Sequence, residues 1–112
     1  MEHINRIELR GKVGTVRPNE YNGAKVANFS LVTEILYKAK DGTPTADTTW
    51  HNIVAWEGRD IKDLDKIVKG AAVHLTGRLR ENRYTSAEGV EKQFYEVLAN
   101  KVRVLTPEEM NV

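Results

Sequence analysis

The feature that most limits how this chain can fold is the stretch at residues 48–56, which reads Thr-Thr-Trp-His-Asn-Ile-Val-Ala-Trp. β-Branched and aromatic residues favour strands, and side chains along a strand alternate between its two faces. Trp50 and Trp56, the only tryptophans of the chain, therefore share one face, while Ile53 lies on the other. Two broad rings on one sheet surface suit stacking with unpaired bases, although most indoles are largely buried. Both an exposed and a buried pair stay open here.

Composition bounds the class of protein. The chain has 112 residues, of which 40% are hydrophobic and 29% charged, and this predicts one globular domain. It contains no cysteine, so it forms neither a disulfide nor a thiolate metal site. No apolar run approaches the roughly 18 residues of a membrane span, and the first residues lack the apolar segment of a signal peptide. We therefore expect a cytoplasmic protein.

Charge is distributed unevenly along the chain, although its net value is only +1. Residues 78–83 hold three arginines against one acid, and four cations lie in or beside the first predicted strand. Acids concentrate in residues 57–65 and again at Glu108 and Glu109. A neutral total can thus hide a basic face, although charge alone fits an ordinary mixed, solvated surface better.

Alternation of apolar and polar residues predicts five strands. They cover residues 4–16, 26–37, 48–56, 72–84 and 94–105. Loops are predicted at residues 18–23, 38–47 and 85–92, the first with the hairpin signal Asn22-Gly23. Gly11 and Gly14 interrupt the first strand and mark the bends that a small barrel needs to close.

A single segment, residues 58–70, has helical spacing instead. Its apolar stripe is Ile61, Leu64, Ile67 and Val68, with Asp60 as the expected N-cap and Gly70 as the stop. We expect this helix to plug one end of the sheet. The order of elements predicts an all-β OB-fold, a five-stranded Greek-key barrel with one helix between the third and fourth strands. Residues 1–105 would form this domain and residues 106–112 a short C-terminal tail.

The sequence carries no recognisable catalytic or metal-binding motif. His3, His51 and His74 lack the spacing of metal ligands, and Ser30 and Ser86 lie outside any nucleophile motif. There is also no phosphate-binding loop and no glycine-rich dinucleotide motif. We therefore expect a protein that is not an enzyme and needs no cofactor.

Four ordered segments resemble the bacterial single-stranded DNA-binding protein family. They are residues 5–14 (NRIELRGKVG), 26–33 (VANFSLVT), 49–56 (TWHNIVAW) and 68–80 (VKGAAVHLTGRLR). The resemblance runs from about residue 4 to residue 105, and the ordered set is more specific than any one segment. It implies an OB-fold protomer that forms a homotetramer and binds single-stranded DNA without sequence preference. Such proteins serve DNA replication, recombination and repair, so the resemblance also implies a nucleoid-associated location.

The resemblance implies base stacking at four aromatic positions, which are Trp50, Trp56, Tyr37 and Tyr84. The last three stand where relatives often carry Phe, Trp and Trp, so every replacement stays aromatic. His51 matches a family position at the subunit interface. We expect phosphate contacts from the basic residues Arg6, Arg10, Lys12, Arg17, Arg78, Arg80, Arg83 and Lys92.

Several neighbouring residues are assigned other roles. Glu8 and Glu81 interrupt the basic pattern and are expected to form surface or intersubunit ion pairs. Tyr21 is expected in a mobile loop, and Phe94 and Tyr95 in the core or at an interface.

The C-terminal residues depart from the family pattern. Family members usually continue into a Gly/Pro/Gln-rich linker and an acidic tip that recruits replication and repair proteins. Residues 106–112 offer only Glu108 and Glu109 and end in Asn-Val, so recruitment through such a tip is not predicted. Either the protein is naturally short or the sequence covers only its core.

Two other functions fit the same predicted fold. A dimeric primosomal accessory protein also binds single strands, although the fuller aromatic set favours the tetrameric binder. An OB-fold module for protein interaction would ignore nucleic acid, and an enzyme is the remotest alternative. The sequence leaves open the number of nucleotides bound, the cooperativity, and whether the role is chromosomal, phage or plasmid.

Overall fold

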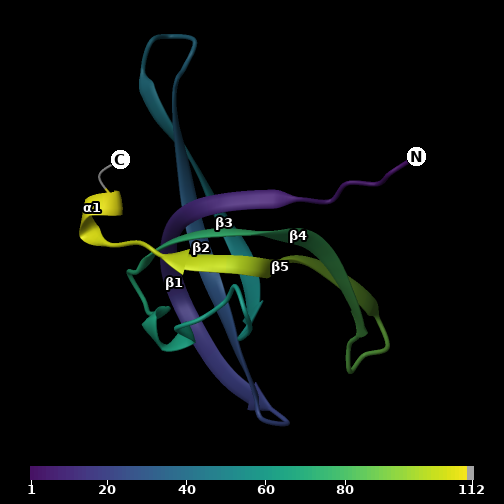
Figure 1. Ribbon diagram of the computed structural model, residues 1–112. Helices are drawn as coiled ribbons and strands as arrows, with labels where there is room; N and C mark the ends of the chain where they lie inside the picture. The colour runs from purple at the N-terminus through teal and green to yellow at the C-terminus, as the bar shows by residue number, and fades with distance from the viewer. Residues whose placement is uncertain (111–112) are drawn as a thin grey trace.

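The computed structural model describes residues 1–110. Its strands are β1 (Ile7–Tyr21), β2 (Ala24–Lys38), β3 (Pro44–Trp56), β4 (Ala72–Thr85) and β5 (Glu91–Val104). A short 3-10 helix, η1 (Leu64–Lys66), and a short α-helix, α1 (Pro107–Met110), complete the described chain (Figure 1). The strands close into a barrel in the order β1-β2-β3-β5-β4, with β3 and β5 paired in parallel. The predicted five-stranded barrel is confirmed.

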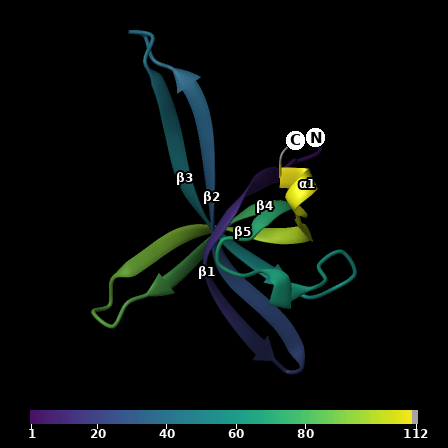
Figure 2. The same cartoon turned by 90° about the vertical axis from the view of Figure 1, so that its left-hand side faces the viewer.

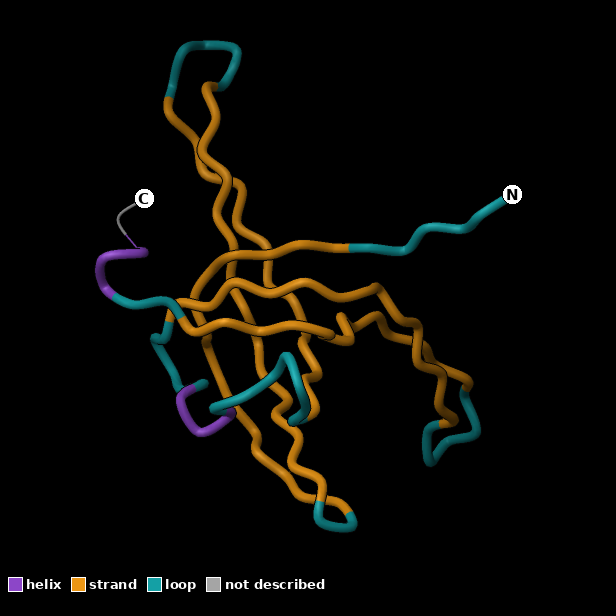
Figure 3. Tube along the Cα trace, viewed as in Figure 1, coloured by secondary structure: helices purple, strands orange, loops and turns teal. Residues whose placement is uncertain are grey.

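Three hairpins extend beyond the barrel as arms, formed by β1–β2, β2–β3 and β4–β5 (Figures 2 and 3). The β1–β2 arm turns at Asn22 and Gly23, which both have positive φ, as the Asn-Gly signal predicts. The strands run further than predicted because the ladder continues along the arms. Residues 18–21 pair within β1–β2, and residues 44–47 pair within β2–β3, so much of two predicted loops is strand.

The hydrophobic core fills the barrel, and every strand contributes to it. Buried examples, one from each strand in chain order, are Val13, Leu31, Ile53, Val73 and Val97. Burial of an aliphatic side chain of this size stabilises the fold by roughly 1.5–3 kcal/mol. Because the core takes one set of alternate residues, the other set on each strand is left on the outside of the barrel.

Close approach of strands at the barrel seam depends on Gly11. A Cβ atom at this position would lie 2.0 Å from the backbone oxygen of Val32 on β2. A register shift between Val13 and Val16 adds a bulge just beyond it, next to Gly14. The two glycines thus mark a close strand crossing and a bulge, which agrees with the bends predicted from the sequence.

The start of β1 lies later than predicted. Ile7 is the first residue of the ladder with β4, where it lies opposite Gly77. Before it, the side chain of Asn5 takes over the pairing. Its Nδ2 donates to the carbonyl of Leu79 at 2.7 Å, and its Oδ1 accepts from the Leu79 N–H at 3.0 Å. A side chain therefore replaces two backbone bonds at this end.

The helix predicted over residues 58–70 is wrong in extent, because only the single turn η1 forms there. Ile61 and Ile67 are buried, as the predicted stripe requires, whereas Val68 is exposed. The residue before the turn is Asp63, in the left-handed region with φ 58°, and it makes no side-chain capping bond. The apolar spacing therefore correctly predicts that this segment packs against one end of the barrel, but it does not correspond to a continuous helix.

The barrel itself explains why this segment does not become a helix. The carbonyl of Asp60 accepts a hydrogen bond from the N–H of Val102 on β5 at 3.1 Å. Ile61 forms isolated bridges with Gly58 and with Val102. The Asp60 carbonyl thus has a long-range partner and Ile61 exchanges backbone bonds with Gly58, so these groups are not free for the i to i−4 bonds of a helix.

The predicted tail begins with an ordered turn. Thr106 and Glu109 exchange hydrogen bonds at the start of α1, and Glu109 also forms an ion pair with Arg103 on β5. Residues 111–112 of the predicted tail lie outside the described part. Over residues 1–110, no helix has the length and apolar character to cross a membrane.

Candidate nucleic-acid interface

The tryptophan face of β3 is open to solvent. Trp50 is 61% exposed and Trp56 is 40% exposed, while the intervening Ile53 is buried in the core. The register with β2 places Trp50 opposite Val32 and Trp56 opposite Val26. Alternation along β3 is thus as predicted, and the buried interpretation of the two indoles is wrong for this chain.

The indole of Trp50 lies over β1 at a position that has no side chain. A Cβ atom on Gly14 would lie 2.7 Å from Cζ3 of Trp50 and 2.6 Å from Oγ of Ser30. The hydroxyl of Ser30 in turn accepts a hydrogen bond from the N–H of Thr15 at 2.9 Å. The bulge in β1 therefore creates the space in which this ring rests.

We expect the substitution Gly14→Ala to displace the indole of Trp50 and to weaken binding of single-stranded oligonucleotides. The loss should be smaller than for removal of the ring, since a displaced indole still offers a stacking face. Tryptophan emission of the free protein should shift, and fluorescence anisotropy with a labelled oligothymidine should report the affinity. Unchanged emission together with unchanged affinity would contradict this placement of the ring.

A second aromatic pair lies at the other end of β3. The ring of Trp56 stands 5.9 Å from the ring of Tyr21, centroid to centroid, with an angle of 49° between the planes. Tyr21 was expected in a mobile loop, but it belongs to β1 and is exposed. Sequence reasoning missed it because Pro18 and the Asn-Gly turn read as loop signals. The pairing of β1 with β2 beyond Pro18 is what brings Tyr21 to Trp56.

A third aromatic pair lies on the β4–β5 arm. Tyr84 and Phe94 are exposed, and their ring centroids are 6.0 Å apart in an edge-to-face arrangement. Phe94 and Tyr95 were expected in the core or at an interface. Both are exposed in the single chain, so the core interpretation is wrong, and the interface interpretation stays a prediction.

Tyr37 is the predicted stacking residue that stands apart. It is exposed near the tip of the β2–β3 arm, opposite Thr45. Along β2 it is five residues from Val32, the partner of Trp50, and an odd separation places it on the other face of the arm. The fold therefore groups Trp50, Trp56 and Tyr84 with two unpredicted aromatics, but it does not add Tyr37 to the tryptophan face.

A groove of about 330 Å³ joins the tryptophan face to the β4–β5 arm. Its floor on β2 and β3 holds polar and apolar residues in equal number, and its edges come from β1 and β5. The lining side chains are those of Thr15, Arg17, Asn28, Phe29, Ser30, Asn52, Ile53, Val54, Phe94 and Glu96. The groove thus has an arginine on one edge and an aromatic ring with a carboxylate on the other.

The predicted phosphate-binding cations fall into several groups and do not form one stripe. Arg17 lines the groove, and Arg6 and Arg78 line a separate polar hollow beside the bulge in β4–β5. Lys12 lies opposite Val32, the partner of Trp50, and so belongs to the same cross-strand row as Trp50. Two others lie elsewhere on the outer surface: Arg10 opposite His74, and Lys92 opposite Tyr84 on the β4–β5 arm.

Two of the predicted phosphate contacts are engaged with acids of the same arm. Arg80 donates from Nε to Oε1 of the buried Glu96 at 3.0 Å. Arg83 donates to Oε1 of Glu81 at 2.6 Å, and this hydrogen bond raises the pKa of Arg83 above its usual value. Both guanidinium groups are therefore partly neutralised before any phosphate arrives.

Glu8 and Glu81, the acids that interrupt the basic pattern of the sequence, form surface ion pairs within the chain, as expected. Glu81 pairs with Arg83, and Glu8 lies 2.8 Å from Nε2 of His74 across β1–β4. The hydrogen bond from His74 lowers the pKa of Glu8 below its usual value.

His51 is half-buried, and its Nε2 lies 2.9 Å from Oγ1 of Thr33. Burial lowers the pKa of this histidine below its usual value. Its predicted place at a subunit interface stays a prediction.

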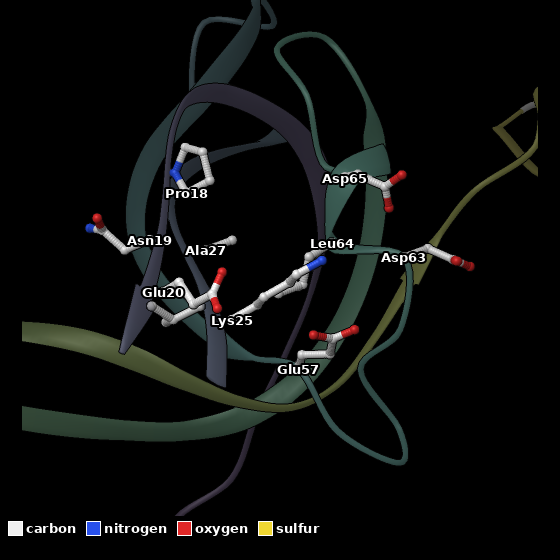
Figure 4. A pocket seen from close by; sticks show the side chains of 10 residues that line it. Pro18, Asn19, Glu20, Lys25, Ala27, Glu57, Asp63, Leu64 and Asp65 are labelled. Carbon is white, nitrogen blue, oxygen red and sulfur yellow. The ribbon is translucent and has the colours of Figure 1, made fainter. Parts of the chain in front are cut away.

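A larger hollow of about 590 Å³ lies between β1–β2 and the η1 segment. Figure 4 shows Glu20, Lys25 and Glu57 around its opening, with Asp63 and Asp65 on either side of Leu64. Four carboxylates against one ammonium repel a polyanion, so size alone does not select this hollow as the nucleic-acid site.

Comparison with known proteins places this geometry in a family. The model of the single-strand binding protein family matches residues 4–105. The chain belongs to the single-strand binding protein family. Its predicted membership is thus confirmed over nearly the whole described barrel.

Several relatives in this family carry the name single-stranded DNA-binding protein. The one from Neisseria meningitidis serogroup A is 30% identical over 106 residues, covering 91% of this chain and 60% of its own. The relative from Bacteroides thetaiotaomicron is 33% identical over 113 residues, covering 96% of this chain and 70% of its own. The chain spans about three fifths of the length of the Neisseria and Xanthomonas relatives that it matches.

Solved structures of the family share the barrel. The Plasmodium falciparum SSB, solved in complex with ssDNA, superposes with a TM-score of 0.80 at 29% identity, covering 95% of this chain and 98% of that one. A deletion mutant of the single-stranded DNA binding protein from Thermus aquaticus superposes with a TM-score of 0.77 at 19% identity, covering 93% of this chain and 51% of that one. The second likeness shows the fold alone, and together they confirm the predicted OB-fold.

Proposed function

We propose that this chain binds and protects single-stranded DNA without strong sequence preference, in replication, recombination and repair. The observation that carries the proposal is the pair of exposed tryptophans on one face of β3, beside a groove edged by Arg17. The family relatives named as single-stranded DNA-binding proteins support the same function.

Stacking explains why such a surface accepts any base. Trp50, the Trp56–Tyr21 pair and the Tyr84–Phe94 pair offer exposed ring faces along the outside of β3 and the β4–β5 arm. Every base has a π-face, and each stacked base contributes on the order of 1–3 kcal/mol. Bases of a duplex are already stacked on each other, so duplex DNA should bind poorly.

The test is a titration of tryptophan fluorescence with oligothymidine and with a duplex of the same length. We expect quenching and tight binding for the single strand, and weak binding for the duplex. A protein-interaction module on the same fold would show no response to either, even at low salt. We also propose that the chain is not an enzyme, which requires the bound strand to stay intact during incubation.

Phosphate neutralisation adds a salt-dependent part to the affinity. Arg17 lines the groove and forms no ion pair with another residue of the described chain. We expect Arg17→Gln to reduce the slope of log affinity against log salt by about 0.7, the value for one phosphate contact on a single strand. Affinity measured by anisotropy at several salt concentrations gives this slope.

The matched control for Arg17 is Lys66, which pairs with Asp63 at 3.9 Å, next to the acidic hollow. The substitution Lys66→Gln makes the same change of charge away from the proposed DNA path. It should leave the slope unchanged. An equal fall in slope for both variants would mean that net charge alone, and not the position of Arg17, governs binding.

We propose that residues 1–105 form one domain, that the chain assembles into a cytoplasmic, nucleoid-associated homotetramer, and that His51 lies at a subunit interface. Family resemblance supports this assembly, and a dimer of the primosomal accessory type is the alternative. Light scattering separates the two, since four copies of 12.7 kDa have twice the mass of two. A monomer would contradict both.

A further inference from the structure

The groove contains a carboxylate that stacking and phosphate binding do not use. Glu96 on β5 is 7% exposed and is the one buried charged residue among residues 1–110. It lines the groove together with Phe94 and Asn52, so it lies where a stacked strand would present its base edges. A carboxylate in this place repels phosphate, which a residue selected only for affinity would not do.

The two oxygens of Glu96 have different surroundings. Oε1 accepts both hydrogen bonds from Arg80 and another from Nδ2 of Asn82. Oε2 has no hydrogen-bond partner in the described chain. Every side-chain oxygen that is fully buried there does have a partner, so Oε2 is not fully buried. Oε2 is therefore the oxygen of this carboxylate that is not sealed from solvent, and Glu96 is one of the side chains that line the groove.

This arrangement fixes the orientation of the acid. Arg80 and Asn82 hold Oε1 from β4, directly across the ladder from β5, so the carboxylate cannot turn without losing three donors. An ionised carboxylate accepts hydrogen bonds and donates none. Oε2 thus offers one fixed acceptor to whatever enters the groove.

We propose that Glu96 is a base-selecting residue, whose Oε2 accepts a hydrogen bond from the exocyclic amino group of a stacked adenine, cytosine or guanine. The proposal rests on the proposed single-strand function and deepens it. Amino groups of these bases are the donors that a carboxylate reads. Thymine offers only N3–H, between two carbonyl oxygens that the carboxylate repels. Base stacking then gives general affinity, and Glu96 adds a modest preference for amino-bearing bases.

Replacement by glutamine makes a sharp test, because the expected geometry is fixed by the neighbours. In Glu96→Gln the amide oxygen should face the donors of Arg80 and Asn82, which leaves the amino group toward the groove. The acceptor in the groove then becomes a donor. Loss of one negative charge should also strengthen binding of every oligonucleotide, so the readout is a ratio of affinities and not an absolute affinity.

The probes are oligodeoxyadenylate and an oligomer of equal length built from unsubstituted purine, which has the same rings but no amino group. Every base of this oligomer lacks the amino group, because a strand that slides along a non-specific surface could otherwise place a remaining amino group at Glu96. The ratio of the two affinities should be about tenfold higher for the wild-type protein than for Glu96→Gln, the value of a hydrogen bond to a charged group. Comparing both proteins cancels any intrinsic difference between the oligomers.

The control variant is Glu81→Gln, on the same arm. Glu81 lies opposite Tyr95, whereas Glu96 lies opposite Arg80, so the two acids are on opposite faces of β4–β5. The charge change is the same, and the affinity ratio should stay at the wild-type value. A ratio that falls equally in both variants would overturn the proposal, because charge and not position would then set it.

The remaining outcomes separate this inference from the function on which it rests. If the wild-type protein binds neither oligomer, the proposed function fails. If it binds both, and Glu96→Gln leaves the ratio unchanged, only base selection by Glu96 fails. Should Glu96→Gln not fold, as judged by circular dichroism, Glu96→Asp replaces it in the same comparison, since it keeps the charge but draws the carboxylate back toward β5. A lower affinity ratio than in the wild-type protein supports the proposal, and an unchanged ratio overturns it.

Discussion

Replacement of Trp50 by alanine should weaken binding of an oligothymidine short enough to contact one protomer by about 5- to 150-fold, which corresponds to the loss of one stacked base. The indole is 61% exposed, so its removal takes little area from the core and the barrel should stay folded. Anisotropy of a labelled oligonucleotide measures the affinity without relying on the remaining tryptophan. Thermal unfolding followed by circular dichroism checks the fold.

The companion variant is Trp50→Phe, which keeps an aromatic face of smaller area. We expect it to retain most of the affinity that Trp50→Ala loses. Equal losses in the two variants would show that the indole itself, and not stacking in general, is required. An unfolded Trp50→Ala protein would instead mean that the ring supports the barrel through its contact at Gly14, and the stacking role would lose its main support.

The largest expected effect on stability comes from Gly11→Ala. The added Cβ would lie 2.0 Å from the carbonyl oxygen of Val32 and 3.0 Å from its carbonyl carbon. Both atoms belong to the β2 backbone, so β1 and β2 must separate where the barrel closes. Overpacking of this kind costs about 1–3 kcal/mol, and the upper end applies because backbone cannot turn aside as a side chain does. Urea unfolding measures this loss of unfolding free energy.

Gly58→Ala is the matched control. A Cβ at Gly58 would meet only the carbonyl oxygen of Trp56, at 4.0 Å, and Gly58 is not among the glycines with positive φ. The free energy of unfolding should change by about 0.5 kcal/mol or less, as for other substitutions on the surface. If both variants lose the same stability, the cause would be glycine content in general and not the strand crossing at Gly11.

These two sets of variants separate the binding surface from the scaffold that positions it. Trp50 should affect affinity with little change in stability, and Gly11 should affect stability first. Gly14 lies between them, since it belongs to the scaffold but makes room for the ring. A loss of affinity in Gly14→Ala without a loss of stability would therefore connect the bulge of β1 directly to the position of the indole.

The sequence by itself determined which residues of β3 share a face, and the structure decided which face is exposed. A strand has a side-chain period of two, so Trp50 and Trp56 had to lie on the face opposite Ile53. It also located the turn at Asn22-Gly23, because few other residues accept positive φ at consecutive positions. Local patterns sufficed for these features because the physics behind them is local.

The tertiary structure alone decided what depends on residues distant in the chain. The N–H of Val102 bonds the carbonyl of Asp60, and a predicted helix shrank to one turn because its backbone found partners on β5. Pairing of β2 with both β1 and β3 likewise placed Tyr21 against Trp56. Pairing of β4 with β5 turned Arg80 from a free cation into the partner of Glu96. No pattern within one segment encodes these contacts, because each requires two segments to meet in the closed barrel.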